Sequence, residues 1–170
     1  MTKKFSMLFN RSIFVDSNII LYHLFGQSDD ATDLLSLGEK NRLRLVTSLR
    51  VLDEVLFKVF LWTAREHFGI QAKAYVKLRK DQELAKKVAH SVDWAQLEDF
   101  FSIFSVVEPT QRDLWKSTHY SREFGLFGND ALSLCLMKRL NLTYIATADK
   151  DFTTINWLKL VEGDWKGSGS

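Results

Sequence analysis

Short apolar runs alternate with longer amphipathic segments along the chain, and this alternation predicts how it folds. The runs typical of buried strands are SIFVD (12–16), LRLVT (43–47), SVVE (105–108), LTYIAT (142–147) and WLKLVE (157–162). The segments between them carry apolar residues at the three-to-four spacing of helices. Strands that alternate with helices indicate an α/β domain whose mostly parallel sheet is covered on both faces.

Polar residues mark the starts of the predicted helices. Ser17 and Asn18 are favourable N-cap residues before the apolar stretch IILYHLF. Further helix caps are expected at Asp29 or Asp30, Ser48, Ser91 and Thr110.

Residues 63–104 keep a helical pattern without a clear strand and include the basic stretch QAKAYVKLRKDQELAKKVAH. This length exceeds a single crossover helix, so we expect a helical arm within one domain that spans residues 1–163. Residues 164–170 end in a Gly/Ser segment typical of flexible and engineered tails.

Composition narrows the classes of partner. The chain is 46% hydrophobic and 26% charged, as ordinary globular proteins are. A formal net charge of +2 creates no global field, so a nucleic-acid site needs a local basic patch. The single cysteine, Cys135, allows no internal disulfide, which fits a reducing, cytoplasmic compartment. No apolar run approaches the roughly 18 residues of a membrane span, so no membrane partner is expected.

Four acidic residues occupy informative positions. Asp16 ends the first predicted strand, Asp149 follows the fourth, Asp130 opens an apolar helix, and Glu54 lies two turns into the helix after the second strand. The carboxyl ends of parallel strands meet at one edge of the sheet, where ligands bind. Gathered carboxylates repel one another and need a cation, and oxygen ligands suit Mg²⁺ or Mn²⁺. A metal ion held in this way would promote the hydrolysis of a phosphodiester.

Each acid also has a purely structural interpretation. Asp16 could be a turn or cap residue, and Asp130 could only complement the dipole of its helix. Glu54 could be a solvated surface acid, and Asp149 with Asp151 could form an Asx-turn. Each acid alone is a weak indication of a metal site, and it is the four acids in this order that indicate one.

The four motifs together resemble the PIN-domain family, and are most similar to VapC-type toxins. The residues that carry the resemblance are IFVDSNIIL (13–21), TSLRVLDEVL (47–56), GNDALSLCL (128–136) and YIATADKDF (144–152). The resemblance implies a parallel sheet of about five strands and an endoribonuclease that depends on Mg²⁺ or Mn²⁺. It also selects Glu54 over the neighbouring Asp53.

Carried over residue by residue, the resemblance implies a site of Asp16, Glu54, Asp130 and Asp149. Asp151 would be an auxiliary metal ligand, and Glu54 would act on water or hold a second ion. Further residues are expected to support the carboxylates: Asn18 and Thr147 by hydrogen bonds, and Ser48 as a helix cap rather than a catalytic group. A metal-activated water would attack phosphorus in line and leave a 5′-phosphate.

RNA would need a basic rim around this acidic centre. Lys73, Lys77 and Lys80 are spaced to share a helix face, and Arg112 and Lys116 form a second set. The plainer alternative for both sets is a solvated charged face. Expected partners are RNA, an antitoxin protein and a second copy of the chain in a homodimer.

Three other functions stay open from sequence alone. The first is a PIN-like module without catalysis that binds RNA or protein, and the second is an RNA-processing nuclease that is not a toxin. The third is an unrelated receiver-like domain that is phosphorylated on aspartate, although it would leave the motifs at Thr47–Glu54 and Asp149–Phe152 unexplained.

Overall fold

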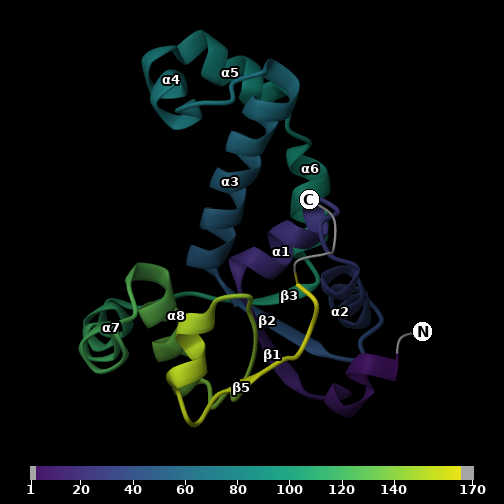
Figure 1. Cartoon of the computed structure of the whole chain (residues 1–170), viewed down its shortest axis with the longest axis vertical. Coiled ribbons are helices and arrows are strands. Elements are labelled where there is room, and N and C mark those ends of the chain that lie inside the picture. Colours follow the sequence, from purple (N-terminus) through teal and green to yellow (C-terminus); the bar gives the residue numbers. More distant parts are fainter. Residues whose placement is uncertain (1–2, 166–170) are drawn as a thin grey trace. The chain divides into compact units, whose positions relative to one another are not determined.

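The computed structural model describes residues 3–165 of the chain (Figure 1). These residues form two compact units. The first unit comprises the described residues up to Leu52 together with those from Ile103 onward, and the second is Asp53–Ser102. The sheet belongs to the first unit.

Five parallel strands form one sheet, as the apolar runs and the resemblance predict, and their order is β3-β2-β1-β4-β5. The strands are β1 (Ser12–Val15), β2 (Arg44–Ser48), β3 (Phe104–Val107), β4 (Tyr144–Ala146) and β5 (Lys159–Leu160). The central strand β1 buries Ile13, Phe14 and Val15 completely. Burial on both faces explains why this strand is a continuous apolar run rather than an alternating one.

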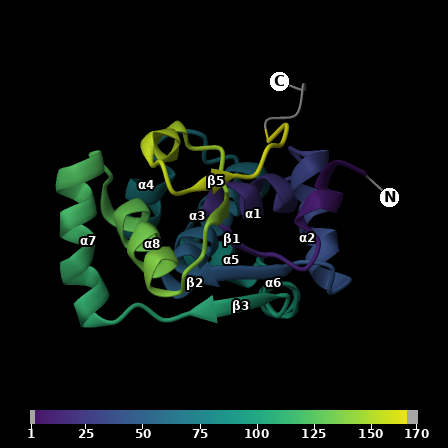
Figure 2. The same ribbon diagram turned by 90° about the horizontal axis from the view of Figure 1, so that it is seen from below.

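Helices of the first unit surround this sheet. They are η1 (Lys3–Leu8), α1 (Ser17–Leu24), α2 (Asp29–Glu39), the start of α3 (Leu49–Phe68), α7 (Gln111–Phe124), α8 (Gly128–Arg139) and η2 (Lys150–Thr154). Figure 2 shows α7 and α8 together on one side of the picture and α1 and α2 on the other. The first unit is therefore a sheet with helix pairs packed around it, as the α/β prediction requires.

Two predicted helix caps lie one or two residues from the observed ones. The side chain of Ser28 accepts from the Ala31 N–H at 3.2 Å, so Ser28 caps α2 in place of Asp29 or Asp30. The side chain of Asp93 accepts from the Gln96 N–H at 2.9 Å, so Asp93 caps α6 in place of Ser91. In each case the chain offers several side chains that can cap a helix within a few residues.

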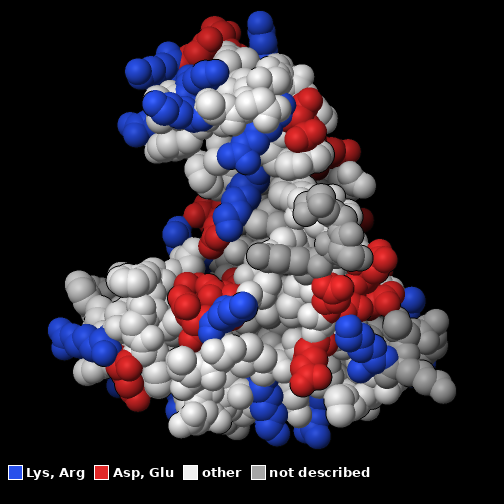
Figure 3. All heavy atoms as spheres, viewed as in Figure 1, with Lys and Arg blue, Asp and Glu red and all other residues white. Residues whose placement is uncertain are grey.

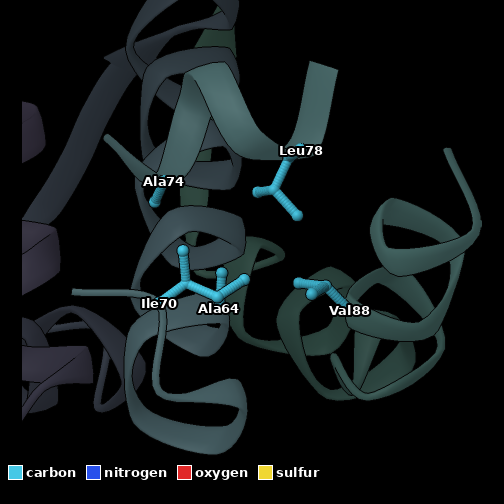
Figure 4. Close-up of a cluster of buried hydrophobic side chains, with 5 residues drawn as sticks. All are labelled: Ala64, Ile70, Ala74, Leu78 and Val88. Carbon is cyan, nitrogen blue, oxygen red and sulfur yellow. The ribbon is translucent and has the colours of Figure 1, made fainter. Parts of the chain in front are cut away.

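The second unit consists of helices. It contains most of α3, followed by α4 (Ala74–Lys80), α5 (Gln82–His90) and α6 (Trp94–Phe101). Figure 4 shows its core cluster, in which small and branched apolar side chains face one another: Ala64, Ile70, Ala74, Leu78 and Val88. The unit therefore has apolar packing of its own.

The C-terminal segment is packed further than the sequence suggests. Trp165 is buried, and its ring stacks on Phe5 with centroids 6.2 Å apart. The carbonyl of Asp164 accepts from the Ser28 hydroxyl at 2.8 Å. Asp164 and Trp165 therefore do not behave as the tail expected for 164–170, and residues 166–170 lie outside the described residues.

Between residues 3 and 165, no helix is long and apolar enough to cross a membrane.

A polar contact network joins α7 to α8. Asp113, only 3% exposed, accepts at Oδ2 from the Thr110 N–H (2.9 Å) and hydroxyl (2.7 Å). The Asp113 N–H donates to Thr110 Oγ1 at 3.2 Å, which completes a capping box. Asp113 Oδ1 pairs with Arg139 Nε at 3.4 Å and accepts from the Cys135 thiol at 3.9 Å. Burial alone would raise the pKa of Asp113, but the Thr110 hydrogen bonds and the Arg139 charge outweigh it and hold this pKa below its usual value.

We expect Asp113→Asn to lower the free energy of unfolding by about 1–2 kcal/mol at pH 7, because it removes a buried cap charge. A carboxyl whose pKa is lowered in the folded state stabilises above its unfolded pKa of about 3.9, and loses this contribution as pH falls through the folded pKa. Urea unfolding should therefore show a constant difference at pH 5–7 that shrinks below about pH 4. The exposed Asp29→Asn serves as the control, and a pH-independent difference would contradict the assignment.

Candidate active site

The ends of β1 and β4 bring Asp16 and Thr147 into contact. Val15 and Ala146 are register partners, so the residue after each of them emerges at the same sheet edge. The Asp16 N–H donates to the Ala146 carbonyl at 3.0 Å and extends the ladder by one residue. The Thr147 hydroxyl donates to Asp16 Oδ2 at 2.7 Å. Two side chains far apart in sequence are therefore joined directly.

The Asp16 carboxylate is fixed by further donors. Its Oδ2 also accepts from Asn18 Nδ2 at 2.8 Å, and its Oδ1 accepts from the Ser17 N–H at 2.7 Å, which makes Asp16 the N-cap of α1. Asn18 Oδ1 in turn accepts from the Ala148 N–H at 3.1 Å. Asn18 and Thr147 thus make the supporting hydrogen bonds that the sequence predicts, and the cap interpretation of Asp16 also describes the structure.

The Thr147 hydroxyl uses its full hydrogen-bonding capacity. It donates once, to Asp16, and accepts from Asn18 Nδ2 at 3.3 Å and from the Asp149 N–H at 3.0 Å. A hydroxyl has one donor and two acceptor lone pairs, so none is left over. Because Thr147 is buried, its hydroxyl fixes the positions of Asp16 and Asp149 relative to each other.

Asp149 and Asp151 form a turn. Asp149 Oδ1 accepts from the Asp151 N–H at 2.9 Å and caps η2. The Asx-turn expected as the structural alternative is therefore present. Asp149 Oδ2 has no hydrogen bond to a described residue, so the same side chain can make the turn and still offer an oxygen to a ligand. Asp151 is exposed beside it.

Asp130 lies in the first turn of α8 and is half-buried. Its neighbour Asn129 accepts from Arg50 Nε at 3.3 Å. The Ser48 hydroxyl accepts from the Val51 N–H at 3.1 Å and is fully buried, as the helix-cap interpretation of Ser48 predicts.

Two supporting contacts were not predicted from the sequence. The Thr47 hydroxyl donates to the Val15 carbonyl at 2.9 Å, and so ties the end of β2 to the end of β1. The Arg50–Asn129 hydrogen bond links the start of α3 to the start of α8. For Thr47 the available signal was a polar residue at the end of an apolar run, whereas nothing in the sequence pairs Arg50 with Asn129.

Glu54 belongs to the second unit. It lies on α3, half-buried, and forms an ion pair with Lys58 one turn further along the helix. Its place in the predicted site therefore remains a prediction from the sequence motif.

The first basic set lies on and before α4. Lys77 and Lys80 are exposed in the last turn of α4, whereas Lys73 precedes the helix as its N-cap with a left-handed backbone (φ 51°). Figure 3 shows basic side chains gathered over α4. Lys73 therefore does not continue the helical face of the other two.

The second basic set lies on α7. Arg112 and Lys116 are exposed, one turn apart, and line the same surface pocket of about 400 Å³. Both sets are thus accessible, which fits either RNA contact or a solvated charged surface.

Acidic side chains are gathered on the face of the first unit near α8 in Figure 3. Among the described residues, however, no three His, Cys, Asp or Glu side chains form a group that could hold a metal ion by themselves. The two carboxylates that demonstrably share supports are Asp16 and Asp149, through Thr147. A metal ion at this edge would need water or substrate oxygens as further ligands.

Comparison with known proteins matches most of the chain to one protein family and to one relative of known name. The model of the PIN domain family matches residues 13–158. Ribonuclease VapC2 of Methanocaldococcus jannaschii is 25% identical over 150 residues, which cover 88% of this chain and 93% of that protein.

Solved structures share the fold at lower identity. A toxin–antitoxin complex from Klebsiella pneumoniae aligns with a TM-score of 0.54 and 18% identity, over 89% of this chain and 98% of that one. VapBC2 from Rickettsia felis, bound to a DNA fragment from its promoter, aligns with a TM-score of 0.53 and 18% identity, over 90% and 99%.

Thr147→Val should destabilise the first unit by about 1–3 kcal/mol, because it keeps the shape but leaves the partly buried Asp149 N–H unpaired and removes a donor from Asp16. Thr147→Ser keeps the hydroxyl and should cost clearly less. Chemical denaturation of both variants measures the difference. Equal stabilities for the two would show that the hydroxyl network contributes nothing.

Proposed function

The chain belongs to the PIN-domain family, and we propose that it is an endoribonuclease that hydrolyses RNA with the help of Mg²⁺ or Mn²⁺. The observation that carries the proposal is the pair of carboxylates at the ends of β1 and β4, held by one buried hydroxyl. The similarity to Ribonuclease VapC2 supports RNA as the substrate class. The family match argues against the receiver-like alternative.

The donor set suits a hydrated hard cation. Mg²⁺ commonly keeps several waters and binds one or two carboxylates together with substrate phosphates, rather than an all-protein cage. Asp16 and Asp149 offer such carboxylates, Asp130 is the proposed third, and Asp151 is auxiliary. When bound, the ion would lower the pKa of a water and stabilise negative charge on the phosphorus oxygens.

The residues around the carboxylates orient them. Thr147 and Asn18 hold Asp16 Oδ2 from two sides, and the Ser17 N–H holds Oδ1, so the side chain has little freedom to rotate. A carboxylate fixed before substrate arrives needs no reorganisation during the reaction, which is how preorganised sites lower barriers. Asn18 and Thr147 are therefore proposed as positioning residues.

Glu54 enters the proposal from its sequence motif alone. Its proposed role is to orient the attacking water or accept its proton, or to hold a second ion. Its ion pair with Lys58 gives this carboxylate a counter-charge within its own helix.

We further propose that the chain is the toxin of a toxin–antitoxin pair, with an antitoxin protein and a second copy of itself as partners. The toxin–antitoxin complex from Klebsiella pneumoniae and VapBC2 from Rickettsia felis, which share the fold, support the toxin–antitoxin part of this proposal. Growth arrest on expression, relieved by the product of an adjacent small gene, would separate a toxin from an RNA-processing nuclease.

Asp16→Asn and Asp130→Asn should each reduce Mn²⁺-dependent cleavage of single-stranded RNA by about a hundredfold or more, because the carboxylate charge is removed while the shape is kept. Sequencing the RNA ends made by the wild type but not by Asp16→Asn gives the cleavage site and the 5′-phosphate. Chelation of the metal by EDTA should abolish cleavage by the wild type.

A matched control is Asp29→Asn, which removes an exposed carboxylate from the first turn of α2 as Asp130→Asn removes one from the first turn of α8. Its cleavage should equal that of the wild type. Undiminished cleavage by both site variants would refute the metal-site proposal, and RNA binding without cleavage by the wild type would favour the inactive binding module.

Asp149→Asn separates the two roles of this side chain. The amide oxygen of asparagine can still accept from the Asp151 N–H, so the turn and the stability should be retained while cleavage falls strongly. Asp151→Asn should reduce cleavage by only a few fold, because Asp151 is an exposed auxiliary acid. Kinetics and thermal unfolding of both variants measure this. Loss of stability without loss of cleavage in Asp149→Asn would leave it a turn residue only.

A further inference from the structure

Helix α7 has an inverted pattern of burial. Its buried residues are the polar Asp113 and Ser117, whereas Leu114 and Trp115 are 52% and 64% exposed. A helix of a globular protein usually turns its apolar side chains inward. The exposed tryptophan therefore needs a reason other than packing.

The anchoring of α7 explains how the tryptophan comes to face outward. Asp113 is fixed on the inner side by Thr110, Arg139 and Cys135. Successive helical residues are rotated by about 100°, so Trp115, two positions later, points away from that side. The polar network thus sets the rotation of α7 and presents Trp115 to solvent.

Cationic side chains surround Trp115 at helical spacing. Arg112, Trp115, Lys116 and His119 line one surface pocket together with Gln111. Arg112, Trp115, Lys116 and His119 follow the three-to-four spacing that brings side chains together on a helix surface. We name these five residues the α7 groove.

The groove is available for a ligand. Within residues 3–165, no aromatic ring stacks on Trp115 and no cation lies over it, and no described acid forms an ion pair with Arg112. Lys116 is exposed, although its charge also helps to lower the pKa of Asp113.

We propose that the α7 groove binds an unpaired nucleotide of the RNA substrate, with the base stacked on Trp115 and the flanking phosphates on Arg112 and Lys116. This inference rests on the proposed nuclease function and adds a substrate subsite to it. Stacking on an aromatic ring beside cations is how single-stranded nucleic acid is held without sequence preference.

The charge of the groove favours RNA over a protein partner. The centres of protein–protein interfaces are depleted of lysine, and Lys116 lines the same pocket as Trp115. The proposed catalytic centre is acidic and repels phosphates, so the substrate needs a cationic surface elsewhere on the chain. The α7 groove combines two cations, Arg112 and Lys116, with the exposed ring of Trp115.

The test uses the full chain and a fluorescein-labelled, unpaired 12-nucleotide RNA in EDTA, so that binding is measured by anisotropy without cleavage. Trp115→Ala should bind about tenfold more weakly than the wild type, and Trp115→Phe, which keeps a ring, should lose clearly less. Arg112→Ala should lower the slope of log Kd against log salt by about 0.7, the value for one phosphate on a single strand. Trp115→Ala should leave this slope unchanged.

Leu114→Ala is the matched control, because it removes a similarly exposed apolar side chain from the adjacent position without lining the groove. It should bind like the wild type. Equal binding by Trp115→Ala and the wild type, equal losses in Trp115→Ala and Leu114→Ala, or no binding by the wild type would overturn the proposal. A dimer that becomes a monomer in Trp115→Ala, seen by size-exclusion chromatography with light scattering, would assign the groove to a second copy instead and also overturn it.

The two proposals fail in different ways. Absence of metal-dependent cleavage by the wild type would refute the nuclease function, whereas the binding measurements in EDTA do not depend on cleavage. Cleavage by a wild type whose RNA binding is independent of Trp115 would refute the α7 groove alone.

Discussion

The hydrogen bond from the Thr147 hydroxyl to Asp16 is the contact on which the candidate site depends. It joins the ends of two neighbouring strands, and it exists only because the register of β1 and β4 places Val15 opposite Ala146. A slip of one residue would turn every side chain of a strand to the other face of the sheet. The buried apolar residues of β1 therefore fix the position of the carboxylate as much as its own hydrogen bonds do.

In the proposed site, the same side chains have structural and chemical roles. Asp16 caps α1 and Asp149 caps η2, and both are proposed to serve catalysis. A capping hydrogen bond uses one of the roughly four lone-pair sites of a carboxylate, so a capping aspartate can also bind a ligand. The structural and functional interpretations of an aspartate after a strand are therefore compatible, and a single sequence motif does not distinguish them.

The sequence predicts the strands well because each is a short apolar run between turn residues. It predicts helix caps less well, as Ser28 and Asp93 show, because several residues near each helix start can make the same hydrogen bond. It identifies Asn18 and Thr147 through the family motif, since their contact depends on register between distant strands. The burial of Trp165 was missed because the Gly/Ser end of the chain dominated the expectation.

The second unit lies within the chain between β2 and β3, which pair with each other from Leu45 and Phe104 onward. An unfolded chain would have to close a loop of about 60 residues to form this edge of the sheet, and the entropic cost of closure grows with loop length. If Asp53–Ser102 folds first around its own apolar cluster, much of that loop is already ordered. The order in which the two units fold is then coupled to how fast β3 joins the sheet.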